Sequence, residues 1–125
     1  MTKNSITSPD LPAPAGAYSH VVEVNGMVFT AGFGPQDPAT GEVPEGVAAQ
    51  TEQVISNVAT ALATVGLTLA DVVKTTVHLE HLHRDVAEYN AVYESRFPEP
   101  YPARTTVGST LANILVEIDV VAVRS

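Results

Sequence analysis

The apolar positions of this chain follow two periods, one typical of strands and one typical of helices. Residues 20–24 and 27–31 have the alternation of strands, and Asn25-Gly26 lies between them. An Asn-Gly pair favours the positive φ angles of a type I′ turn, so these residues predict a β-hairpin.

Further strands are expected at both ends of the chain and in its middle. They are a short strand near Ile6, Val72–Glu80, Ala103–Val107 and about Leu115–Val123. Within the second of these, one face should carry Val73, Thr75, Val77 and Leu79. The last strand is largely apolar on both faces, which indicates that neither face meets water.

Two segments have the helical period. The first runs from Val47 to Val65, and Gly66 stands where a left-handed C-terminal cap is expected. The second is expected from about Asp85 to Phe97, with Asp85 as its N-cap. Pro98 should end it.

This order of elements predicts an α+β two-layer domain in which two helices cover one face of a mixed sheet. The 125 residues fit one domain, residues 1–125. Because the helices can cover only one face, a partner subunit is the simplest cover for the other.

Composition excludes several classes of function. The chain has no cysteine, which removes disulfides, thiolate metal sites and cysteine nucleophiles. Its net charge is −8 and its six basic residues are scattered, so nucleic-acid binding is disfavoured. The first residues lack the apolar core of a signal peptide, and no apolar run is long enough to span a membrane, so we expect a cytoplasmic protein with no membrane partner.

Two charged residues near the end of the chain are candidates for chemistry. Glu117 lies between apolar neighbours, where a carboxylate is costly unless it is paired, so it is either a base that positions water or a partly exposed acid at a strand end. Arg104 opens a strand after a proline-rich connector. It could bind a carboxylate with two hydrogen bonds, or it could be a surface residue whose stem covers apolar area.

Other candidates are weaker on their own. Tyr18 could donate its hydroxyl to a ligand, and Asn90 could cap a loop or face solvent, but each residue alone is more often structural. The run from His78 to His83 invites a metal interpretation, yet it crosses a strand end and has no helical His-Glu-x-x-His spacing. We therefore expect no metal site.

Several segments together resemble one known family, RidA (YjgF), in order and spacing over nearly the whole chain. They are Gly16-Ala17-Tyr18-Ser19-His20, Phe29-Thr30-Ala31-Gly32, Asp71-Val72-Val73-Lys74-Thr75-Thr76-Val77, Tyr89-Asn90-Ala91-Val92-Tyr93, Pro102-Ala103-Arg104-Thr105-Thr106-Val107 and Val116-Glu117-Ile118-Asp119. The fifth and sixth segments are the most specific.

The resemblance implies a chorismate-mutase-like fold and a homotrimer with a barrel-like core. It also implies hydrolytic deamination of reactive 2-imino and 2-enamino acids, such as 2-aminoacrylate, without a cofactor. By this resemblance Arg104 holds the substrate carboxylate, Glu117 activates water, and Tyr18 and Asn90 line or support the site.

Three positions of the expected pocket wall depart from the best-known deaminases of the family. Ala31 stands where those enzymes have serine, Phe33 where they have glutamine, and Thr106 where cysteine is common. The stretch 107–114 is also shorter than in typical members. We expect these differences to bear on the choice of substrate.

Three other functions stay open at this point. The same cleft could bind a small carboxylate without turnover, as a regulatory module. The family has also been labelled as a ribonuclease or translation inhibitor, which the charge of −8 disfavours. A different small-molecule reaction is the third, because one fold permits many uses.

Overall fold

The computed structural model describes residues 2–125. It has one six-stranded sheet with the strand order β1-β2-β3-β6-β4-β5. The strands are β1 (Asn4–Ile6), β2 (Val21–Val24), β3 (Met27–Thr30), β4 (Val72–Leu79), β5 (Ala103–Gly108) and β6 (Val116–Val123). Only β4 and β5 are parallel, so the sheet is mixed as predicted.

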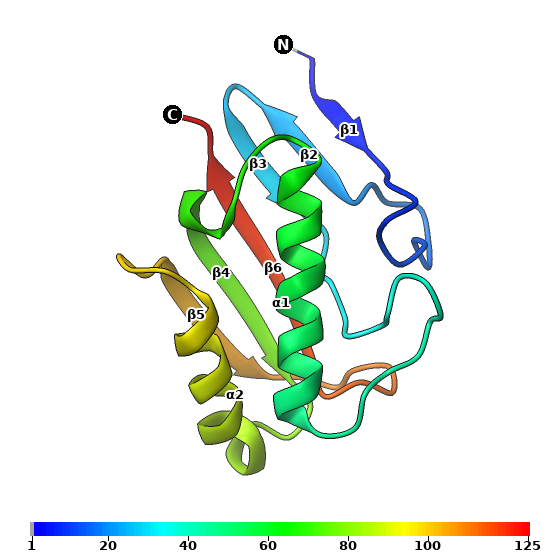
Figure 1. Ribbon diagram of the computed structural model, residues 1–125, viewed down its shortest axis with the longest axis vertical. Coiled ribbons are helices and arrows are strands. Elements are labelled where there is room, and N and C mark those ends of the chain that lie inside the picture. The colour runs from blue at the N-terminus through cyan, green and yellow to red at the C-terminus, as the bar shows by residue number, and fades with distance from the viewer. Residues whose placement is uncertain (1) are drawn as a thin grey trace.

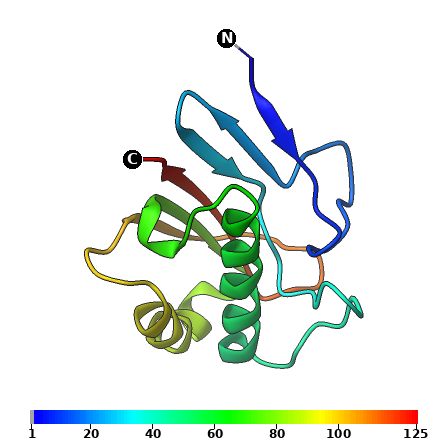
Figure 2. The same ribbon diagram turned by 45° about the horizontal axis from the view of Figure 1, so that its top comes forward.

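Both long helices, α1 (Val47–Ala63) and α2 (Leu82–Arg96), lie on the same face of the sheet (Figure 1), and the tilted view shows the two layers (Figure 2). A short 3-10 helix, η1 (Leu69–Asp71), precedes β4. The predicted α+β two-layer arrangement is therefore confirmed. No helix within residues 2–125 has the length and apolarity that a membrane crossing requires.

The local predictions with the strongest backbone signals are confirmed. Asn25 and Gly26 have φ angles of 57° and 77°, as a type I′ turn requires. Gly66 has a φ of 75°, and the Leu67 N–H donates to the Leu62 carbonyl at 3.0 Å, which closes the end of α1. The short strand near Ile6 is β1, which pairs with β2.

The predicted start of the second helix was wrong. Helix α2 begins at Leu82, and the residue before it, His81, gives no side-chain cap. Leu82 packs against the core, so extending the helix buries it. Asp85 instead lies in the first turn, where a negative charge favours a helix, and its buried carboxylate accepts two hydrogen bonds from Arg84.

The predicted face of β4 was wrong at one residue. The pairing of β4 with β6 shifts register between Val72 and Lys74, which marks a bulge. Val72 is consequently buried, whereas Val73 is 49% exposed. Thr75, Val77 and Leu79 are fully buried as expected.

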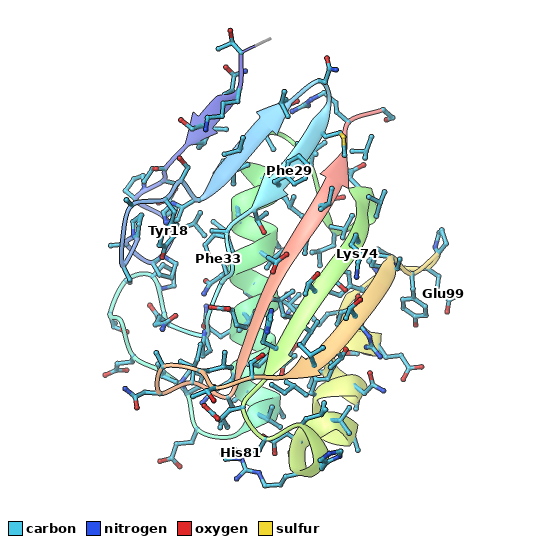
Figure 3. All side chains as sticks on the ribbon, turned by 180° about the vertical axis from the view of Figure 1, so that it is seen from behind. Tyr18, Phe29, Phe33, Lys74, His81 and Glu99 are labelled. Carbon is cyan, nitrogen blue, oxygen red and sulfur yellow. The ribbon has the colours of Figure 1, made fainter. Side chains whose placement is uncertain are left out.

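The core lies between the sheet and the two helices, while the opposite face of the sheet stays open. Figure 3 shows this open face, with Phe29 on β3 and Lys74 on β4. It carries large apolar side chains, and Met27 and Phe29 are 42% and 40% exposed. The described residues therefore leave uncovered the face that the sequence predicts a partner subunit would cover.

Candidate active site

Arg104 lies on the edge strand β5 and faces the helices. It is paired with the buried Thr75 of β4, so both side chains are on the helix side of the sheet. The guanidinium carbon is 4.7 Å from the ring centre of Tyr93 and 5.6 Å from that of Tyr89, both on α2. Its Nη1 donates to the Asn90 side-chain oxygen at 2.7 Å. Helix α2 therefore holds Arg104 with neutral groups only.

Arg104 differs from the other three arginines of the chain. Each of those three forms a salt bridge with a carboxylate: Arg84 with Asp85, Arg96 with Glu52 and Arg124 with Glu23. Within residues 2–125, Arg104 has no such partner. Its side chain lines a cavity of about 330 Å³ together with Asn90, Tyr93, Glu94, Tyr101 and Pro102. An exposed guanidinium with a free edge is suited to bind an anion from outside the chain.

The tyrosines below Arg104 are buried and stay protonated at neutral pH. Burial raises the pKa of Tyr89 to about 12, against the opposite effect of Arg104. Burial also raises the pKa of Tyr93, whose hydroxyl shares a 2.8 Å hydrogen bond with Thr75. The Thr106 hydroxyl lowers the pKa of Tyr89 a little, although neither hydroxyl completes a hydrogen bond of good geometry within residues 2–125.

Glu117 lies on β6 opposite His78 of β4, and its side chain points to the open face of the sheet. It lines a second cleft, of about 500 Å³, whose walls include Tyr18, His20, Gly32, Phe33 and Ile114. A Cβ atom on Gly32 would stand 3.0 Å from the Glu117 carboxyl carbon. The absence of a side chain at residue 32 therefore leaves room for the carboxylate.

The loop beside Glu117 is held by α1 and β6. Phe33 and Ile118 exchange two backbone hydrogen bonds, of 2.9 and 3.1 Å, which fix the loop next to the start of β6. Asn57 of α1, 1% exposed, donates from its amide to the carbonyls of Gly34 and Gln36, each at 3.0 Å. Sequence reasoning missed Asn57, although a polar residue on the apolar face of a helix was a usable signal.

The loop that carries Tyr18 is held by His20. The buried His20 ring accepts from the Ser8 N–H at 3.0 Å and donates to the Pro12 carbonyl at 2.7 Å, so both of its nitrogens are used in structural hydrogen bonds. The Tyr18 hydroxyl accepts from the Ala15 N–H at 3.0 Å. Figure 3 shows Tyr18 and Phe33 on the same side of the molecule.

Of the remaining candidate residues, Phe33 lines the cleft beside Glu117, whereas Ala31 and Thr106 line neither cleft. The Phe33 ring belongs to the core and is 4% exposed, 5.7 Å from the His20 ring. Ala31 is half-buried and donates its N–H to the His20 carbonyl. Thr106 faces the helix side near Tyr89. Within residues 2–125, no three His, Asp or Glu side chains gather where they could hold a metal ion.

One chain does not bring Arg104 and Glu117 together. Along β4, Thr75 is paired with Arg104 and lies on the helix side, whereas His78 is paired with Glu117 and lies on the open side. The two expected catalytic residues therefore occupy opposite faces of one sheet. Strand alternation alone could not reveal this, because it does not give the register in which one strand pairs with the next.

Comparison with known proteins identifies the family. The family model described as Endoribonuclease L-PSP matches residues 8–124. The chain is 39% identical over 125 residues to the 2-iminobutanoate/2-iminopropanoate deaminase of Escherichia coli strain K12, covering 96% of this chain and 97% of that one.

Two solved structures have the same fold over the whole length. The YjgF gene product of E. coli has a TM-score of 0.91 at 38% identity, covering 98% of this chain and 99% of that one. E. coli TdcF, solved with bound serine, has a TM-score of 0.91 at 35% identity, with coverage of 98% and 99%. The family match, the identity over the full length and the shared fold together place this chain in the RidA (YjgF) family.

Proposed function

We propose that this protein hydrolyses 2-imino and 2-enamino acids to 2-oxo acids and ammonia. The observation that carries the proposal is the state of Arg104, an exposed arginine that neutral groups hold in place and that has no carboxylate partner in residues 2–125. A substrate carboxylate supplies that partner. The related E. coli deaminase and the serine-bound TdcF, serine being an α-amino acid, support the same substrate class.

In the proposed reaction Arg104 binds the carboxylate and fixes C2 of the imine near a water molecule. Glu117 accepts a proton as the water oxygen bonds to C2 of the protonated imine, which gives a neutral carbinolamine. Glu117 returns this proton to the nitrogen and takes the proton of the hydroxyl as the C=O bond forms and the C–N bond breaks, and the leaving ammonia carries that proton away as ammonium. An enamine first takes a proton at C3 to become the protonated imine. The imine carbon is already electrophilic, so the proposed reaction uses no cofactor.

We further propose a homotrimer in which Arg104 of one copy meets Glu117 of the next. This assembly would join two residues that one chain keeps on opposite faces of its sheet. It would also cover the open face, where Val107 and Val123, each 38% exposed, add to the apolar area. A barrel-like core of three sheets is the expected result.

The test of both proposals is release of 2-oxo acid from imines that an amino-acid oxidase generates in the assay. The wild type should accelerate release, whereas Arg104→Ala and Glu117→Gln should each be inactive. The two inactive variants are then unfolded together, mixed equally and refolded. In a cyclic trimer with shared sites, about one quarter of all sites would regain both residues.

The outcomes separate the alternatives. Recovery of activity on mixing supports shared sites, and no recovery places the whole site within one chain. If the wild type accelerates no imine but binds a 2-oxo acid, the cleft is a binding module. An RNA substrate in a parallel assay tests the ribonuclease description, and cleavage that Arg104→Ala abolishes would overturn the deaminase proposal.

A further inference from the structure

We propose that Tyr93 is a positioning residue whose ring serves as a platform for the Arg104 guanidinium, and that Thr75 fixes this ring. The inference rests on the proposed role of Arg104 in binding the substrate carboxylate. It goes beyond that role, because it assigns a function to an aromatic residue that would otherwise be read as core.

The platform is built from contacts on several sides of one ring. The Tyr93 hydroxyl and the Thr75 hydroxyl share a buried hydrogen bond of 2.8 Å, which ties the ring to β4. Phe97 stacks on Tyr93 with ring centres 4.4 Å apart and planes inclined by 22°. Tyr89 packs at 5.8 Å. Tyr93 is only 4% exposed, so its ring has little freedom to turn.

Arg104 needs such support because its own side chain is exposed and flexible. An arginine that samples many rotamers loses that freedom when it binds a ligand, and this loss weakens binding. The Tyr93 ring lies 4.7 Å from the guanidinium carbon, within the range of cation–π attraction. Asn90 holds one end of the guanidinium, and the Tyr93 ring lies next to the guanidinium carbon.

The platform also leaves the positive charge of Arg104 intact. A carboxylate in place of Tyr93 would hold the arginine as firmly but would compete with the substrate. A protonated phenol offers an electron-rich face and no net charge. Burial, which raises the pKa of Tyr93, keeps it in that form at neutral pH.

Three variants separate positioning from simple packing. Tyr93→Leu removes the ring. The double variant Tyr93→Phe with Thr75→Val keeps the ring and removes both hydroxyls, so neither is left buried without a partner. Val28→Ala shortens a fully buried side chain on β3, three strands away from β5, and controls for lost stability alone.

We expect Tyr93→Leu to raise KM for the imine, and the Kd for 2-oxobutanoate measured by calorimetry, by about three- to tenfold. Its kcat should stay within about twofold. The double variant keeps the ring but loses the hydrogen bond that fixes it, so both constants should lie between those of the wild type and Tyr93→Leu, and Val28→Ala should leave them unchanged. In ligand-free protein the Arg104 δ protons should show an upfield ring-current shift in the nuclear magnetic resonance spectrum, which only Tyr93→Leu abolishes.

The platform is refuted if Tyr93→Leu keeps the wild-type Kd, or if Val28→Ala raises Kd as much. It is also refuted if the ring-current shift is absent in the wild type. Failure of the proposed function looks different: the wild type would then accelerate no imine, or Arg104→Ala would bind and convert substrate like the wild type. The ring-current measurement decides on the platform even in that case.

Discussion

At the scale of single residues, the charge that Arg104 can offer depends on the neutrality of its neighbour Asn90. The amide oxygen of Asn90 accepts a 2.7 Å hydrogen bond from Arg104 and carries no net charge. An aspartate in the same place could accept the same bond and would add a negative charge. The side chain at residue 90 therefore controls whether Arg104 can still attract an anion.

Asn90→Asp should raise KM for the imine roughly ten- to a hundredfold, because the new carboxylate pairs with Arg104 and competes with the substrate. Steady-state kinetics with the oxidase-coupled assay measure this. Asn25→Asp, in the hairpin turn where φ is 57°, adds the same charge away from the site. An equal rise of KM in both variants would assign the effect to net charge instead of local pairing.

At the scale of elements, the parts of the fold set by local backbone chemistry could be predicted from the sequence. The turn at Asn25-Gly26 and the left-handed conformation of Gly66 after α1 depend on nearest neighbours, and both were found as expected, although α1 ends at Ala63, two residues before the predicted Val65. The bulge that exposes Val73 depends on pairing with β6, which lies far along the chain. The start of α2 depends on the packing of Leu82. Both predictions were wrong because contacts between elements distant in the sequence determine the structure at these two places.

In the candidate site, too, the features set by local sequence were predictable and those set by tertiary contacts were not. The residue pattern singled out Arg104 and Glu117 and placed each on a strand, and the resemblance implied their roles. Which faces they occupy follows from the register in which β5 and β6 pair with β4, which no local pattern contains. The sequence indicated only that the aromatic residues of α2 form an apolar face. The contact between Tyr93 and Arg104 joins α2 to β5, so it could not be predicted from the pattern of either element alone.

Helix α2 carries a buried phenol that should make the protein sensitive to alkali. The unfolded Tyr89 loses its proton near pH 10, whereas burial raises the pKa of the folded residue to about 12. Between these values the folded state binds more protons, so the free energy of unfolding falls as pH rises. The loss should reach about 2 to 3 kcal/mol across this window.

Tyr89→Phe should remove that part of the decline. Denaturant unfolding at pH 10 and pH 12, followed by far-ultraviolet circular dichroism, gives the difference between wild type and variant. Tyr101→Phe removes a phenol that is 45% exposed and should change the decline less. Identical declines in wild type and Tyr89→Phe would contradict the prediction.

At the scale of the whole molecule, the open face of the sheet is where a single chain leaves large apolar side chains exposed to solvent. Large apolar side chains on β3, β5 and β6 meet solvent there, while the helix side is densely buried. A face of this kind is typical of an interface. The proposed assembly and the proposed catalysis consequently depend on the same surface.

Phe29→Glu should prevent assembly, because it would bury a charge where Phe29, 40% exposed in one chain, is expected to pack against a neighbour. Light scattering after size-exclusion chromatography should give a smaller particle, and deaminase activity should fall to background although Arg104 and Glu117 are intact. Val43→Glu changes a residue that is 37% exposed in a loop and is the matched control. A Phe29→Glu protein of unchanged mass would show that this face is not the interface.

The opposite placement of Arg104 and Glu117 has a kinetic consequence. If each working centre needs two copies, the unit of catalysis is a contact between chains, and a lone chain has none. Below the dissociation constant of the assembly, the rate would therefore rise more steeply than in proportion to protein concentration. The level of expression alone would then set the activity per molecule, with no effector required.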